Sequence, residues 1–203
     1  MWCHYSELIP LFDIDVINYY ILIVQSYNLS VRQLREKIRN NEYERLDEKT
    51  KLKLIEQKRT NVYDFVKNHI LIKNSCNYKE ISEKVLKKLI LEDIDNFLQE
   101  LGSGFCYIAN EYKIKIGNNY NYIDLLLFNI EFNCYVVVEL KTTELMKEHI
   151  GQIEIYMNCI DKNLKKITQD RTIGIIVCKK NNKYIIEYSS DKRILACEYQ
   201  LSY

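Results

Sequence analysis

Apolar, β-branched and aromatic residues dominate the stretch 120–141, which reads YNYIDLLLFNIEFNCYVVVELK. Runs of this kind are typical of strands that are buried on both faces. We therefore predict two strands, Tyr122–Phe128 and Cys134–Lys141, joined by a turn near Asn129–Asn133. The rest of the chain is expected to be organised around this hairpin.

Three charged residues interrupt the apolar pattern of the hairpin: Asp124 in the first strand, and Glu139 and Lys141 at the end of the second. Side chains alternate faces along a strand, so Glu139 and Lys141 share a face. A turn centred between Glu131 and Phe132 would place Asp124 opposite Glu139, with Cβ atoms roughly 5 Å apart. Two carboxylates at that distance repel unless a divalent cation binds between them. Lys141 would then hold a water or a phosphate oxygen, an arrangement typical of metal-assisted phosphodiester hydrolysis.

The first 75 residues show helical periodicity. Asp13 and Ser30 are residue types that favour the N-cap position. A polar stretch, Lys73–Tyr78, is the best candidate for a linker. The predicted helices are Ser6–Leu11, Asp13–Tyr27, the segment SVRQLREKIRN that Ser30 caps, and a short helix from Thr60 or Asn61 to about Ile72.

Basic residues accumulate between Val31 and Arg59, where ten Lys and Arg stand against six Asp and Glu. Arg32, Arg35 and Arg39 recur on one side of the predicted helix. One interpretation is a helical region that contacts phosphates without reading sequence. The alternative is a solvated helix face stabilised by neighbouring charge pairs.

The second half of the chain alternates helical and strand patterns. Apolar residues at helical spacing predict a long helix over Lys79–Leu101 with Gly102 as its C-cap, and another over Leu145–Lys162. The further predicted strands are Phe105–Asn110, Tyr112–Ile116, Thr172–Cys178, Tyr184–Tyr188 and Ile194–Tyr199. We therefore expect a helical domain over residues 1–75 and an α/β domain over residues 76–203.

Composition narrows the function further. A chain of 203 residues holds one ordinary domain, or one domain with a smaller helical appendage. The net charge of +1 means that any nucleic-acid partner must use a local patch. Seven cysteines without a C-x-x-C pair argue against zinc and for reduced thiols in the cytoplasm. No apolar run reaches the roughly 18 residues that a membrane span needs, and no export signal is evident.

Residues 102–199 resemble the C-terminal nuclease domain of the YhcG-type family, a branch of the PD-(D/E)xK nuclease superfamily. The matching segments are FLQELGSGF (97–105), YIDLLLFN (122–129), CYVVVELK (134–141), HIGQIEIYMNCID (149–161), TIGIIVCKK (172–180) and EYQL (198–201). Upstream, the segments similar to the end of the family's helical N-terminal domain are WCHYSELI, NYYI, SVRQLREKI and YERL. Family members carry a longer N-terminal segment, so we expect this chain to start partway into that domain or to be a natural short form.

The resemblance implies a restriction-endonuclease-like core: a helix, a mixed sheet of four strands, a second helix and further strands, preceded by helices. It implies that Asp124, Glu139 and the backbone carbonyl of Leu140 bind Mg²⁺ or Mn²⁺. Lys141 would orient the attacking water or stabilise charge on the phosphate. The expected activity is metal-dependent hydrolysis of DNA by an endonuclease, which we expect to act as a homodimer because two strands need two cuts.

Further site residues follow from the same resemblance. Gln152 and Tyr156, four residues apart on one helix face, are similar to a Q-x-x-x-Y element beside the site; the alternative is a polar residue and a core aromatic. The superfamily also uses a helix-borne Glu, for which Glu100 is the best match and Glu92 the rival. His149 is expected at the surface or behind the metal ligands.

Two departures concern substrate binding. Asn110-Glu111 stands where many relatives have Arg-Gln, and Thr142-Thr143-Glu144-Leu145 replaces the usual Gly and Phe. Neither changes the Asp, Glu and Lys core. A second hypothesis is therefore a DNA-binding or interaction protein that retains the nuclease fold with little activity, and the sequence does not separate DNA from RNA as substrate.

Overall fold

The computed structural model describes residues 2–55 and 66–203. The chain divides into two compact units, Met1–Phe65 and Val66–Tyr203, whereas the sequence suggested a division after residue 75. Within the described residues, none of the helices combines the length and apolar character that a membrane crossing requires.

Four helices make up the described part of the first unit: α1 Trp2–Leu8, α2 Ile14–Tyr27, α3 Val31–Arg39 and α4 Glu48–Ile55. Both predicted N-caps are confirmed, since Asp13 accepts a hydrogen bond from the Asp15 amide and Ser30 forms a capping box with Gln33. The helix predicted over Ser6–Leu11 lies four residues earlier than expected. It begins before the apolar run and ends at Leu8, so the prediction of its start was wrong.

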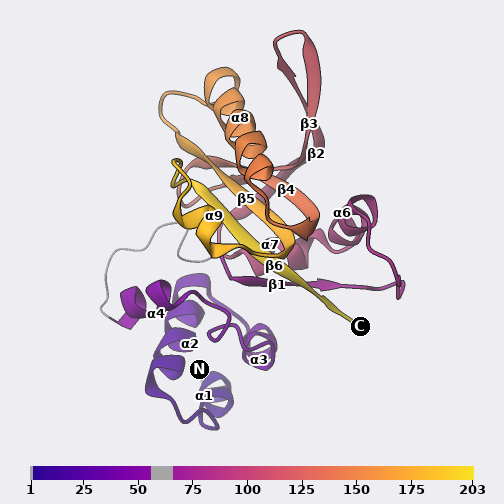
Figure 1. The fold of residues 1–203 in the computed structure, drawn as a ribbon. Coiled ribbons are helices and arrows are strands. Elements are labelled where there is room, and N and C mark those ends of the chain that lie inside the picture. Colours follow the sequence, from indigo (N-terminus) through magenta and orange to yellow (C-terminus); the bar gives the residue numbers. More distant parts are fainter. Residues whose placement is uncertain (1, 56–65) are drawn as a thin grey trace. The chain divides into compact units, whose positions relative to one another are not determined.

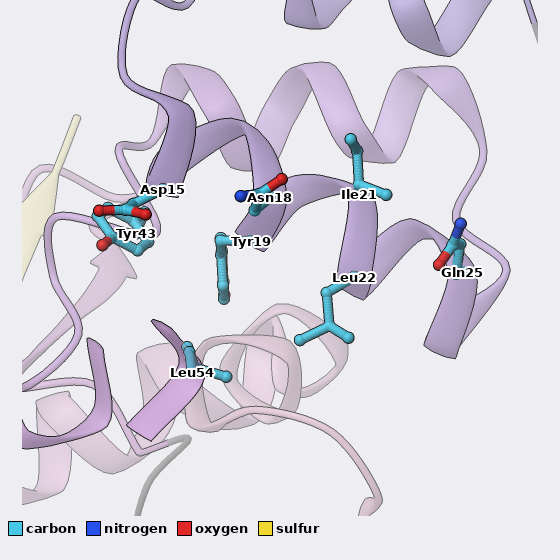
Figure 2. Close-up of a pocket in the computed structure, with 8 residues that line it drawn as sticks. All are labelled: Asp15, Asn18, Tyr19, Ile21, Leu22, Gln25, Tyr43 and Leu54. Atoms are coloured by element: carbon cyan, nitrogen blue, oxygen red, sulfur yellow. The ribbon is translucent and has the colours of Figure 1, made fainter. Parts of the chain in front are cut away.

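The interior of the first unit is built from apolar and aromatic side chains of α2 and α3, including Tyr20 and Leu34. A buried polar group lies among them: Glu42 accepts hydrogen bonds from the Tyr19 hydroxyl at 2.9 Å and from Lys37 at 2.8 Å. A cavity of about 370 Å³ opens beside α2 (Figure 2). It is lined by Asp15, Asn18, Tyr19, Ile21, Leu22, Gln25, Tyr43 and Leu54.

A six-stranded mixed sheet forms the centre of the second unit, which confirms the predicted α/β class (Figure 1). The strand order is β1-β6-β5-β4-β3-β2. β2, β3 and β4 pair antiparallel, while β4, β5, β6 and β1 pair parallel. The strands are β1 His69–Lys73, β2 Phe105–Ile116, β3 Asn119–Asn129, β4 Cys134–Glu144, β5 Asp170–Lys180 and β6 Ile194–Ser202.

Helices cover this sheet. α6 Glu83–Glu92 packs against β4 and β1, α7 Ile94–Leu101 against β1 and β2, and α8 Lys147–Asn163 against β5 and β4. Close approach of α8 depends on Gly174 in β5, where a Cβ atom would lie 2.6 Å from the Met157 sulfur. Val136, Val137 and Val138 of β4 are fully buried, as predicted for a strand covered on both faces.

Three element predictions in this unit were wrong. The helix expected over Lys79–Leu101 is two helices, because Asp93 leaves helical geometry with φ −135° and ψ 53°. The strands expected over Phe105–Asn110 and Tyr112–Ile116 are one strand with a bulge between Tyr107 and Ala109. Tyr184–Tyr188 is not a strand: α9 Lys183–Glu187 occupies most of it, and none of the described strands pairs with it.

The helix expected from Thr60 or Asn61 to Ile72 falls partly on residues 60–65, which lie outside the described residues. Its last four positions belong to β1, so the prediction was wrong there. β1 forms by parallel pairing with β6, in which His69 lies opposite Glu198. A partner more than 100 residues away leaves no local sequence signal.

Candidate active site

The predicted hairpin carries the candidate site. Asn129 pairs with Cys134 and Leu125 with Val138, so the predicted register of β3 and β4 is confirmed. Continuing that register would set Asp124 opposite Glu139, but backbone pairing ends at Leu125. At that point the Asp124 carboxylate, in place of a backbone carbonyl of β3, accepts a hydrogen bond from the Leu140 amide at 3.0 Å. The two strands therefore separate at the carboxylate pair.

Glu139 is the most unusual group of this site. Only 3% of its side chain is exposed, and its Oε1 atom has no hydrogen-bond partner among the described residues. Burial and the nearby Asp124 carboxylate raise the pKa of Glu139, Lys141 opposes them, and the resulting value is about 7. An unsatisfied buried carboxylate oxygen costs free energy, which a cation would recover.

Lys141 lies beside this carboxylate, with its Nζ atom 3.5 Å from Oε2 of Glu139. The same ammonium is 4.0 Å from Oε1 of Glu83, which α6 contributes. The alternation of β4 thus brings Glu139 and Lys141 together, as the sequence indicated. Leu140 between them is fully buried, so only its backbone is available to a ligand.

Lys87 of α6 was missed by the sequence analysis. Its Nζ atom lies 2.6 Å from Oδ1 of Asp124 and 3.1 Å from Oε1 of Glu111. Both oxygens of Asp124 are therefore engaged, one by Lys87 and one by the Leu140 amide. The signal that could have found Lys87 and Glu83 is their spacing of four on one amphipathic helix, which places both on the same side.

The two acids expected from the helical segment lie elsewhere. Glu100 is buried against β1, where it receives a hydrogen bond from the Leu71 amide at 3.0 Å and forms an ion pair with Lys67 at 3.4 Å. Glu92 accepts a hydrogen bond from Ser75 at 3.1 Å. Glu83, at the start of α6, approaches Lys141, whereas Glu92 is the last residue of that helix.

Gln152 and Tyr156 contact each other, since the Gln152 amide donates to the Tyr156 hydroxyl at 3.0 Å. Tyr156 belongs to the core cluster under α8. In the described part of the chain, neither side chain hydrogen-bonds to Asp124, Glu139 or Lys141. The interpretation of Tyr156 as a core aromatic therefore agrees with its surroundings.

His149 is buried rather than at the surface. Its Nδ1 atom accepts a hydrogen bond from the Met146 amide at 3.2 Å, which caps the start of α8. Burial lowers the pKa of His149, and the Lys141 charge lowers it further. A neutral imidazole is therefore favoured behind Lys141, consistent with an Nδ1 atom that accepts.

A candidate metal centre here would rest on few protein ligands. Among the described residues there is no group of three His, Cys, Asp or Glu side chains placed to hold a metal ion. Asp124, Glu139 and the Leu140 carbonyl supply oxygen atoms, which are the ligands that Mg²⁺ prefers, and Mg²⁺ commonly keeps waters and substrate phosphate in its remaining positions. The unpartnered Oε1 of Glu139 fits such an ion.

Most of the chain matches a known protein family. Residues 63–203 match the family described as YhcG PDDEXK nuclease domain. The protein YhcG of Escherichia coli (strain K12) is 23% identical over 211 aligned residues, which cover 97% of this chain and 55% of YhcG. This chain therefore spans about half the length of that relative.

Two solved structures show partial similarity. A repair endonuclease from Pyrococcus abyssi is 19% identical, with a TM-score of 0.43 over 61% of this chain and 49% of that chain. The structure of an EndoMS–dsDNA2 complex is 20% identical, with a TM-score of 0.41 over 62% of this chain and 48% of that chain.

Proposed function

Because the chain belongs to the YhcG PDDEXK nuclease family, we propose that it hydrolyses DNA phosphodiester bonds at a divalent metal ion, Mg²⁺ or Mn²⁺. The observation that carries this proposal is the buried, unpartnered Oε1 atom of Glu139, close to a second carboxylate and to a lysine. The ligands are Asp124, Glu139 and the Leu140 carbonyl. When bound, the ion supplies Lewis-acid chemistry, by which it polarises a phosphate oxygen and lowers the pKa of water.

Lys141 is proposed to act on the reacting groups. Its ammonium lies within 4 Å of two carboxylates, which hold it in place. From that position it can donate to the attacking water or to a phosphate oxygen that gains charge.

Glu83 is proposed as the helix-borne acid of the site, the role for which the sequence favoured Glu100. It is about half exposed, and its carboxylate faces Lys141. We propose that Glu83 positions Lys141, and that Glu100 is part of the protein's interior structure. Gln152 and Tyr156 are proposed to support the α8 side of the site through their mutual hydrogen bond.

A second candidate function is DNA binding with little nuclease activity. The observation that favours it is the ion pair between the Lys87 ammonium and Asp124 at 2.6 Å. If that ion pair persists in the presence of metal, the chain is a DNA-binding protein with a weakly active nuclease fold. Calorimetric titration of Mn²⁺ into the full chain separates the two functions. Binding heat that disappears in Asp124→Ala and Glu139→Gln supports the nuclease.

A nicking assay on supercoiled plasmid DNA with Mg²⁺ tests the activity itself. The wild-type protein is expected to nick, and Asp124→Ala is expected not to. Equal nicking by both proteins would contradict the assigned site. A homodimer is proposed because one centre cuts one strand, and sedimentation of the full chain with and without DNA measures it.

The basic helix α3 of the first unit is proposed as a secondary DNA contact. Arg32 and Arg39 are exposed, whereas Arg35 forms a bidentate ion pair with Glu7 at 2.6 and 3.1 Å. Exchanging Arg32 and Arg39 for Gln should therefore weaken DNA binding and reduce its salt dependence. Exchanging Arg35 should affect the first unit's stability instead.

A further inference from the structure

The hairpin formed by β2 and β3 continues beyond the body of the sheet (Figure 1). Its outer part lies past the end of the β3–β4 ladder, so β2 is the strand that pairs with β3 there. Lys113 lies opposite Tyr122, and Lys115 opposite Tyr120, before the turn at Gly117. This segment, Lys113–Tyr122, is called the ribbon below.

The two faces of the ribbon differ in chemistry. One face carries Ile114 and Ile123, which are buried in the core cluster that includes α8. The other carries two lysines and two tyrosines, and Tyr120 and Tyr122 are 57% and 55% exposed. The opposite face supplies the packing against the core, and the tyrosines and lysines of this face are accessible to a ligand.

The exposed face has an ordered arrangement. The Lys113 ammonium lies 3.8 Å from the centre of the Tyr120 ring, a cation–π contact that holds the ring and sets a positive charge beside it. Tyr120 and Tyr122 are two residues apart on one strand, which corresponds to about 7 Å. That is about twice the 3.4 Å spacing of bases along a nucleic-acid strand, so the rings can stack on alternate bases.

The same face leads to the candidate active site. Residues 120, 122 and 124 project to one side of β3, so Asp124 follows the two tyrosines directly. Exposure alternates accordingly, with Ile123 buried between Tyr122 and the partly exposed Asp124. A strand lying along the tyrosines and lysines would therefore be directed toward Asp124 and Glu139.

We propose that this ribbon face binds an unpaired nucleic-acid strand, with bases stacked on Tyr120 and Tyr122 and phosphates at Lys113 and Lys115. Aromatic side chains beside basic ones, here on neighbouring strands, are the chemistry that recognises single strands without sequence preference, whereas duplex bases present no free faces for stacking. Binding of a strand by the ribbon does not depend on the proposed nuclease function. Only the inference that the bound strand reaches the metal site rests on that function.

Binding is tested on the full chain with fluorescently labelled oligothymidylate, by anisotropy in EDTA, so that neither metal nor cleavage is involved. Tyr120→Ala/Tyr122→Ala is expected to weaken binding about tenfold or more, since two bases lose the rings on which they stack. Tyr120→Phe/Tyr122→Phe keeps the rings and should bind as the wild type does. Lys113→Gln/Lys115→Gln should reduce the salt slope by roughly 1.4.

The matched control exchanges exposed residues of the same types around α9: Tyr184→Ala/Tyr188→Ala and Lys183→Gln/Lys192→Gln, which should leave binding unchanged. Thermal unfolding of each variant checks that it is folded. Wild-type affinity in the Tyr120→Ala/Tyr122→Ala variant would overturn the inference. An equal loss of affinity for a blunt duplex of the same length would overturn the assignment to unpaired strands.

The nuclease proposal and the strand-binding proposal can each be refuted without the other. If the wild-type chain binds oligothymidylate through the ribbon but does not nick DNA with Mg²⁺, the nuclease proposal falls and the binding face stands. If it nicks DNA while ribbon variants bind as the wild type does, the binding face falls and the nuclease stands.

Discussion

Replacing Glu139 with Gln tests the physical basis of the site without any assumption about substrate. Burial raises the pKa of Glu139 from its ordinary 4.5 to about 7. The folded state therefore holds this proton more tightly than the unfolded state does. The resulting stabilisation is fully present below about pH 4.5 and is lost as the pH rises through about 7.

The magnitude follows from the size of the shift. A change of pKa from 4.5 to about 7 corresponds to about 3 kcal/mol, at about 1.36 kcal/mol for each pH unit. Near pH 8 the metal-free protein carries a charged Glu139 at this cost. Gln has nearly the same shape as a protonated Glu but no charge, so Glu139→Gln should stabilise the metal-free protein near pH 8 by up to about 3 kcal/mol and by little near pH 5.

Urea unfolding of the full chain in EDTA, followed by circular dichroism at both pH values, measures the difference. Hydrogen exchange of the β4 and β5 amides shows whether the change in stability belongs to the second unit. Glu187→Gln, at an exposed position of α9, is the matched control and should change nothing. Added Mn²⁺ should stabilise the wild type according to its concentration and leave Glu139→Gln unaffected.

One result would refute this reasoning. If Glu139→Gln destabilises the metal-free protein equally near pH 5 and pH 8, the Glu139 carboxylate is stabilised in its charged form. Its buried oxygen would then have a partner in solution, and the argument for a cation at this position would fail.

Three other substitutions test Lys141 and Lys87 at the site and Glu100 away from it. Lys141→Met should lower plasmid nicking by roughly two to three orders of magnitude while calorimetry still detects Mn²⁺ binding; retained nicking would exclude its role at the phosphate. Lys87→Met should tighten Mn²⁺ binding several-fold in calorimetry, because it removes the cation that pairs with Asp124; weaker binding would show that Lys87 supports the site. Glu100→Ala should destabilise the second unit by ~3 kcal/mol in urea unfolding, because the buried Lys67 loses its ion pair, with Mn²⁺ affinity unchanged.

The carboxylate pair was predictable because its geometry is local. A four-residue turn fixes the register of β3 against β4, and strand alternation then fixes which side chains meet. The caps at Asp13 and Ser30 were predictable for the same reason, since each depends on residues two or three positions away.

Residues that reach the site from another element were not predictable in this way. The ion pairs of Glu83 and Lys87 with the strand residues depend on how α6 lies over the sheet, and that placement follows from packing of the whole unit. Motif order alone favoured Glu100, but α7 directs this side chain to β1, where it satisfies the Leu71 amide.

The strand and helix errors have a similar origin. The segment 184–188 has the composition of a strand but has no partner among the described strands, and the Asn181 backbone amide fixes the chain before it by donating to Glu198 at 2.8 Å. The segment 69–72 has no clear periodicity and becomes a strand because β6 is available as a partner. Strand propensity decides the outcome only where a pairing partner exists.

The end of the β3–β4 pairing links the candidate site to the proposed binding face. The residues of β3 before Leu125 pair with β2 but not with β4, and there the Asp124 carboxylate accepts the hydrogen bond of the Leu140 amide in place of a backbone partner. That separation exposes the ribbon and also opens the sheet at the carboxylate pair. A longer β3–β4 ladder would satisfy the Leu140 amide from the backbone, remove the need for Asp124 there, and hold the ribbon within the sheet. The proposed metal ligand Asp124 and the proposed binding face therefore depend on the same break in strand pairing.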